Sequence, residues 1–195
     1  MTNAFFTELA RCLRKQGIDS EIQKDRRLEI FLHGQPALFV SPKNEVFLLP
    51  EMSGNDEAGD LYHEVAQISN EVFSYVEAVQ SAAHLKANGL SEDFRLLADF
   101  GGAVLAGRKR ENGWGYQFVT WLWDYNRNGV SLGHYYEDDY HAAKQDCTDL
   151  LIICWRTAQN SNRSISRQFK LPGQRLSTLS RISRKGWNRN KIRDN

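Results

Sequence analysis

Residues 61–83 read LYHEVAQISNEVFSYVEAVQSAA. Through this stretch apolar side chains recur in steps of three and four residues, at Leu61, Val65, Ile68, Val72, Val76, Val79 and Ala83. That spacing places them on one side of an α-helix, because a helix turns once in 3.6 residues. The pattern predicts a long amphipathic helix within residues 56–90, ended by the turn pair Asn88-Gly89.

The residues before this helix, 1–50, predict a shorter helix followed by a small antiparallel sheet. Apolar side chains share one helical face over residues 3–16, and Gly17 is a natural helix stop. Four strand-like segments follow, at residues 21–23, 28–32, 37–40 and 46–49. Turn residues separate them, which is typical of a meander.

The residues after the long helix, 94–155, predict an aromatic hairpin and a closing helix. In chain order we expect a short helix over 92–98, hairpin strands over 103–106 and 116–125, a strand over 130–136 and a helix over 140–155. The fold class is therefore expected to be α+β, with small antiparallel sheets packed against the long amphipathic helix and a basic C-terminal tail.

The formal net charge of +1 conceals two regions of opposite charge. Residues 156–195 hold eleven basic residues and one acidic residue, a net charge of +10. The first 155 residues hold 14 basic and 23 acidic residues, a net charge of −9. The sequence thus predicts an acidic body at 1–155 and a basic tail at 156–195, partly disordered when free because it has little apolar surface to bury.

The composition also bears on the cellular location of the protein. No apolar run reaches the roughly 20 residues that a membrane-spanning helix needs, and charges interrupt the first seventeen residues, so no secretory leader is predicted. We expect a soluble, cytoplasmic protein that makes no membrane contact. The three cysteines, Cys12, Cys147 and Cys154, are an odd and sparse set, which favours buried thiols over a disulfide framework or a metal site.

Two stretches carry a resemblance to known proteins. Residues 94–107 read FRLLADFGGAVLAG, and residues 116–146 read YQFVTWLWDYNRNGVSLGHYYEDDYHAAKQD. They resemble a family of small proteins carried by conjugative elements, plasmids and phages of Firmicutes. The chain departs from that family after residue 146, where Cys147 stands in place of an aromatic residue and the basic tail follows.

The resemblance implies a function but no catalytic residues. Such elements carry antagonists of host defence, anti-CRISPR and antirestriction proteins among them. We therefore expect a non-catalytic protein, without a cofactor, that inhibits a host defence nuclease. The most specific form of this expectation is that the nuclease is a type II CRISPR effector. The alternative is a nucleic-acid-binding accessory protein of a conjugative element.

The aromatic hairpin supplies the predicted partner-binding residues: Trp114, Tyr116, Trp121, Trp123, Tyr125, Arg127, Tyr135 and Tyr136. One interpretation is that one face of the hairpin is core and the rest contacts a protein partner. The other is that exposed rings stack on unpaired bases, with arginines nearby. We favour the protein contact, because the body is acidic and would repel phosphates.

The run from Gly133 to His141 suggests a weak candidate metal site, formed by His134, Asp138 and His141. Imidazole and carboxylate groups bind zinc or manganese, and a metal-dependent hydrolase would be a third, less favoured function. An acidic turn that caps a helix explains the same residues without a metal, and we favour that interpretation.

The tail supplies the predicted nucleic-acid-binding residues: Arg163, Arg167, Lys170, Arg175, Arg181, Arg184, Lys185, Trp187, Arg189 and Lys191. Basic side chains at this density bind the phosphate backbone of RNA or DNA without sequence preference. A solvated tail with no ligand is the alternative.

Overall fold

The computed structural model describes residues 2–111, 115–150 and 152 of the 195-residue chain. These belong to one compact unit, Met1–Trp155. Trp114 and all ten predicted nucleic-acid-binding residues of the tail lie outside the described residues. No helix in the described part of the chain has an apolar segment long enough to cross a membrane.

Helix α1 (Thr2–Lys15) opens the chain, as the sequence predicted. Its buried apolar residues, Phe5, Phe6, Leu9 and Leu13, recur at helical spacing. The helix ends where Gly17 adopts a φ of 77°, a conformation that glycine takes without steric cost. The amide of Ile18 then donates to the carbonyl of Leu13 at 3.0 Å, which satisfies one of the last helical carbonyls.

The first sheet is the predicted meander. Its strands β1 (Ser20–Ile22), β2 (Leu28–Leu32), β3 (Gln35–Val40) and β4 (Val46–Leu48) pair antiparallel in chain order. Leu28 and Ile30 on β2 are opposite Val40 and Leu38 on β3, and all four side chains are buried. This period-two alternation fixes one face of the sheet against the helices.

After a short 3-10 turn, η1 (Pro50–Met52), the chain enters helix α2 (Asp56–Ser81). Asn55 caps its first turn, accepting a hydrogen bond from the amide of Ala58 at 3.1 Å. The buried residues of α2 follow the helical period: Ala58, Val65, Ser69, Val72, Tyr75, Val76 and Val79. The helix ends nine residues before the predicted limit at residue 90, because Ala82 turns to extended backbone.

The segment after α2 lies beside the second sheet. The amide of Leu85 donates to the carbonyl of Phe94 at 2.8 Å, and the amide of Leu96 donates to the carbonyl of Ala83 at 2.9 Å. The predicted short helix over 92–98 is therefore wrong. This stretch becomes strand β5 (Arg95–Phe100), since its backbone groups find partners on both sides in the sheet.

The second sheet continues with β6 (Ala103–Lys109), β7 (Tyr116–Trp123) and β8 (Val130–Tyr135), all antiparallel in chain order. Residues 140–150 are helical, and the Asp139 side chain accepts from the amide of Ala142 at 2.8 Å. The molecule is thus an α+β protein with two four-stranded antiparallel sheets.

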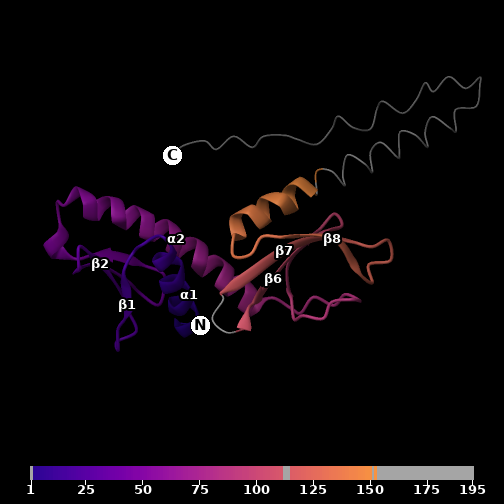
Figure 1. Cartoon of the computed structure of the whole chain (residues 1–195), viewed down its shortest axis with the longest axis horizontal. Coiled ribbons are helices and arrows are strands. Elements are labelled where there is room, and N and C mark those ends of the chain that lie inside the picture. The colour runs from indigo at the N-terminus through magenta and orange to yellow at the C-terminus, as the bar shows by residue number, and fades with distance from the viewer. Residues whose placement is uncertain (1, 112–114, 151, 153–195) are drawn as a thin grey trace, which may run out of the picture. The chain divides into compact units, whose positions relative to one another are not determined.

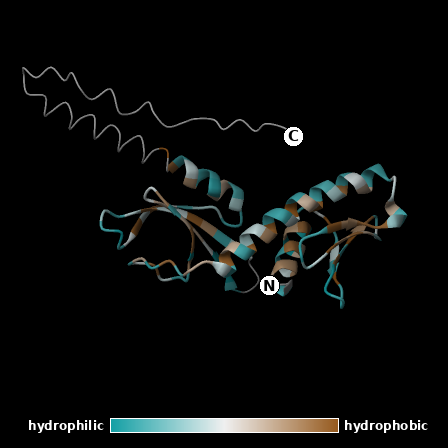
Figure 2. Ribbon diagram, turned by 180° about the vertical axis from the view of Figure 1, so that it is seen from behind, coloured by the Kyte–Doolittle hydropathy of each residue, from teal (hydrophilic) through white to brown (hydrophobic). Residues whose placement is uncertain are grey.

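Two hydrophobic cores hold these layers together. The larger core joins α1, α2, the inner face of the first sheet and one face of β6 and β7. The smaller core lies on the other face of the second sheet, around Phe94, Val119 and Trp121. Helix α2 contacts β4 of one sheet and β5 and β6 of the other (Figure 1). Figure 2 shows polar residues along one side of α2 and apolar residues along the other.

Candidate functional site

Five carboxylates share one side of α2: Asp56, Glu57, Asp60, Glu64 and Glu71. At about 100° per residue they fall within an arc of about 100°, which adjoins the buried stripe. Four of the five are exposed, and Glu71 is half-buried. No Lys or Arg occurs anywhere in α2. We call these five residues the acidic face.

The acidic face is almost unpaired. Glu57 lies 2.9 Å from the imidazole Nε2 of His33. Within the described residues, the other four carboxylates make neither an ion pair nor a side-chain hydrogen bond. From Asp56 to Glu71 the helix rises about 22 Å, so it presents about one charge per 4–5 Å. Each strand of duplex DNA presents one phosphate per 3.4 Å of axis, a similar density.

The aromatic hairpin divides into a buried and an exposed part. Tyr116 is 2% exposed and Trp121 is 4% exposed, so these two predicted partner-binding residues belong to the cores. Tyr116 packs against Tyr75 with ring centroids 5.3 Å apart, and Trp121 meets Phe94 edge-on at 5.0 Å. The alternation in the sequence did not show this, because β7 is buried on both faces from Tyr116 to Trp121.

The exposed part lies at the turns of the second sheet. Tyr125 in the β7–β8 turn is fully exposed, and Phe100, the last residue of β5 before the β5–β6 turn, is 66% exposed. Both turns lie at the same end of the sheet, since Arg127 pairs with Asp99 at 2.6 Å. The Arg127 guanidinium also lies 5.5 Å from the ring centroid of Trp123.

Further exposed apolar side chains follow along the edge strand β8. Leu132 and Tyr135 are both more than half exposed. We call Phe100, Tyr125, Leu132 and Tyr135 the apolar end. Sequence reasoning missed Phe100 and Leu132. The signal for Phe100 was its place beside Gly101-Gly102, because a glycine pair marks a turn and turns lie at the surface.

The three weak metal candidates do not form one site. His134 Nδ1 lies 3.1 Å from Asp146 Oδ2, whereas Asp138 pairs with Arg11 and Lys15. His141 is exposed. Among the described residues, no three His, Cys, Asp or Glu side chains are close enough to hold a metal ion. Tyr136 is half-buried beside Asp146, and burial together with that negative charge raises the pKa of Tyr136.

A polar network that the sequence did not predict joins α1, α2 and residue 138. The Glu8 carboxylate, 4% exposed, accepts hydrogen bonds from Arg11 Nη2 at 2.6 Å and from the Tyr75 hydroxyl at 2.8 Å. Arg11 Nη2 also donates to Asp138 Oδ2 at 2.8 Å. Burial, and then the charges of Cys12 and Glu8, raise the pKa of Tyr75 well above its usual value.

The cysteines in the described part are free thiols. Cys12 lies beside the polar network, with its Sγ 3.5 Å from the Tyr75 hydroxyl, and Cys147 is buried. Burial raises the pKa of both thiols, which keeps them protonated and poorly nucleophilic at neutral pH. Cys154 lies outside the described residues.

Comparisons of the chain with protein-family models, with curated proteins and with solved structures find no match.

Proposed function

We propose that this chain is a non-catalytic protein of a bacterial mobile element that inhibits a host defence nuclease. The target that we propose is a type II CRISPR effector, bound through its protein surface, its guide RNA or its DNA. The observation that carries the proposal is the acidic face, which presents a line of carboxylates with almost no cationic partner in the described part of the chain.

The charge of the acidic face complements the surface that a nuclease uses. A CRISPR nuclease holds its heteroduplex of about 20 base pairs in a positively charged channel and recognises it by its backbone. A helix with about one carboxylate per 4–5 Å offers such a channel a substitute for phosphates. Occupying the channel excludes the nucleic acid, so inhibition needs no bond to form or break.

The apolar end supports a second contact with the same partner. Large side chains such as Phe100 and Tyr125 are exposed at neighbouring turns, where they add little to the fold. Aromatic residues of this kind dominate the affinity of protein interfaces when a pocket on the partner covers them. The two surfaces have separate roles in the proposal: charge brings the proteins together and apolar contact holds them.

A pulldown tests the proposal. The full chain is immobilised and presented with a type II nuclease, with and without its guide RNA, in a salt series. The test variant is Asp60→Asn/Glu64→Gln/Glu71→Gln. The matched control is Asp19→Asn/Glu21→Gln/Glu51→Gln, which changes the net charge equally at exposed positions outside the acidic face.

We expect the nuclease to be retained by the wild type and by the control variant. The acidic-face variant should bind at least tenfold more weakly, since ion pairs at such interfaces are worth about 1.4 kcal/mol or more. Rising salt should weaken the binding. If instead the chain binds bare RNA or DNA tightly and ignores the nuclease, the accessory-protein alternative replaces this one.

A further inference from the structure

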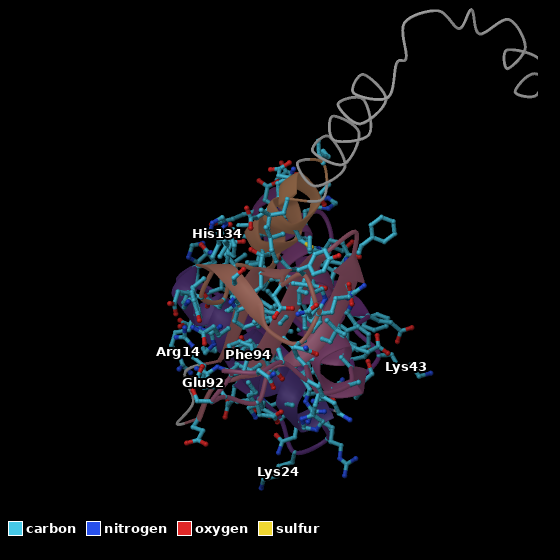
Figure 3. The ribbon with its side chains drawn as sticks, turned by 90° about the vertical axis from the view of Figure 1, so that its right-hand side faces the viewer. Arg14, Lys24, Lys43, Glu92, Phe94 and His134 are labelled. Carbon is cyan, nitrogen blue, oxygen red and sulfur yellow. The ribbon has the colours of Figure 1, made fainter. Side chains whose placement is uncertain are left out.

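A groove with cationic walls lies where α1 meets the second sheet. It consists of two adjoining cavities of about 860 Å³ and 740 Å³. Lys109 and Arg110 at the end of β6 line both cavities, as does Tyr116 at the start of β7. Figure 3 labels one residue from each cavity, Arg14 and Glu92, which lie on the same side of the molecule in that view. We call this feature the cationic groove.

The lining of the cationic groove is richer in cations than the body around it. Among the described residues, six cationic side chains line it: Arg11, Arg14, Arg95, Arg108, Lys109 and Arg110. Four described carboxylates line it with them, and Glu137 and Asp138, outside the lining, pair with Arg110 and Arg11. The first 155 residues as a whole carry −9. The groove therefore repels anions less than the rest of the body does.

Ion pairs within the groove leave particular cations uncompensated. Glu8 is engaged by Arg11, and Glu92 pairs with Arg108 at 2.8 Å. Arg14 and Lys109 are exposed and make no ion pair with any residue that the structure describes. The other lining cations all have a carboxylate partner, so these two side chains, from α1 and from β6, are the ones available to an anion.

The groove is also held in shape before a ligand arrives. Arg108 Nε donates to Gln117 Oε1 at 2.9 Å across the β6–β7 pair, and its guanidinium stacks 5.0 Å from the centroid of the buried Phe94 ring. Its Nη1 donors have no partner among the described residues. A fixed guanidinium loses little entropy when it binds an oxyanion, and its planar fork suits phosphate.

We propose that the cationic groove binds a ligand that carries several phosphate groups: a nucleoside polyphosphate or a short single strand of nucleic acid. A single small anion would fill little of two cavities of this size. Cations from α1, β5 and β6 are spaced along the groove. A ligand with anionic groups at several points could therefore contact more than one of them. This site is separate from the acidic face and does not depend on nuclease inhibition.

The test uses the full chain and three probes: ATP, an eight-residue thymidine oligonucleotide and inorganic phosphate. Binding of ATP and phosphate is measured by calorimetry and binding of the oligonucleotide by fluorescence anisotropy. The groove variant is Arg14→Gln/Lys109→Gln. The control, Lys24→Gln/Lys43→Gln, removes the same charge from exposed positions in turns of the first sheet, outside the groove. Thermal melting checks that both variants fold.

We expect ATP or the oligonucleotide to bind the wild type and to bind the groove variant at least tenfold more weakly, because two charged hydrogen-bond donors are lost. The Lys24→Gln/Lys43→Gln control should keep its affinity within twofold for the probe that the groove binds. Glu111→Gln, which removes a carboxylate from the groove, should raise the affinity about twofold to threefold.

The probe that loses affinity in the groove variant shows which ligand the groove binds: ATP stands for a nucleoside polyphosphate, and the oligonucleotide stands for a single strand of nucleic acid. Three results would overturn the proposal: neither ATP nor the oligonucleotide binds, the groove variant binds as the wild type does, or the Lys24→Gln/Lys43→Gln control loses as much affinity as the groove variant. Equal affinity for inorganic phosphate and for both larger probes would also overturn it, because the groove would then hold only one anion.

Discussion

Arg11 in the first helix donates a hydrogen bond from Nη2 to Oδ2 of Asp138, 127 residues further along the chain, at 2.8 Å. The same guanidinium holds the buried carboxylate of Glu8 through two hydrogen bonds, at 2.6 Å and 3.0 Å. One side chain therefore compensates a buried charge and fixes the start of the last described helical segment against α1. Hydrogen bonds to Glu8 first, and to Asp138, raise the pKa of Arg11 above its usual value and keep it charged.

Arg11→Ala should destabilise the protein by about 3–5 kcal/mol, because it leaves the Glu8 carboxylate buried with only the Tyr75 hydroxyl as a strong partner. Urea unfolding followed by tryptophan fluorescence measures the change. Arg14→Ala is the matched control, since Arg14 lies on the same helix, is exposed and makes no ion pair with described residues. It should change the free energy of unfolding by less than about 0.5 kcal/mol. Equal effects would contradict the role of the network.

Gly115→Ala should lower the free energy of unfolding more than Gly34→Ala does. Both glycines have nearly the same left-handed backbone, with φ of 77° and 78°, so both substitutions carry a conformational cost of about 1–2 kcal/mol. A Cβ at Gly115 would lie 2.5 Å from Arg11 Nε, whereas nothing lies within 4 Å at Gly34. We expect an additional loss of about 1–3 kcal/mol at Gly115, measured by urea unfolding. Similar losses at both sites would show that Arg11 does not pack on this turn.

The contribution of Asp138 to stability should depend on pH. Burial alone would raise its pKa, but hydrogen bonds from Lys15 and Arg11 outweigh burial and lower the pKa below its usual value. A carboxylate with a lowered folded pKa stabilises the fold above its unfolded pKa of about 3.9, and that contribution is lost as the pH falls through the folded value.

The free energy of unfolding of Asp138→Asn should therefore be lower than that of the wild type by the largest amount above about pH 5, and by progressively less below about pH 4. Unfolding curves at pH 6 and pH 3 measure both differences. Asp19→Asn, an exposed carboxylate without an ion pair in the described part, provides the comparison. If the loss of stability caused by Asp138→Asn grows as the pH falls, the pKa of Asp138 is not lowered in the folded protein and the prediction is contradicted.

Substitution of Trp121 should lower the free energy of unfolding far more than substitution of Tyr125, although the two residues are only four positions apart in the aromatic hairpin. Tyr125→Ala should change the free energy of unfolding by less than about 0.5 kcal/mol, because the side chain is fully exposed. Trp121→Ala should cost about 3–5 kcal/mol, because it empties the core around Phe94. Thermal and urea unfolding give both values. A large loss of stability for Tyr125→Ala would remove it from the apolar end.

Much of the fold could be predicted from local patterns. The spacing of apolar residues in α1 and of the buried residues in β2 and β3 repeats clearly enough to locate these elements within one or two residues. The segment from residue 82 to residue 100 could not be located in the same way. Its conformation depends on pairs such as Leu85 with Phe94 and Leu96 with Ala83, whose members lie apart in the sequence and meet only in the folded chain.

Less of the candidate site could be predicted. The acidic character of the body and a helix from residue 56 were evident, but only the structure shows that the carboxylates of this helix have almost no cationic partner among the described residues. Tyr116 and Trp121 looked like surface aromatics because period-two alternation does not reveal a strand buried on both faces. The cationic groove joins Arg14 to Lys109, and no local pattern brings residues so far apart together.

Cleavage of a plasmid by a guide-loaded type II nuclease tests the central claim most directly. The nuclease is incubated with the wild-type chain, with Asp60→Asn/Glu64→Gln/Glu71→Gln or with Asp19→Asn/Glu21→Gln/Glu51→Gln before the plasmid is added. We predict that the wild type and the second variant block cleavage, whereas the acidic-face variant needs at least a tenfold higher concentration. Full cleavage in the presence of excess wild-type chain, or equal inhibition by all three proteins, would contradict the claim that the acidic face inhibits the nuclease.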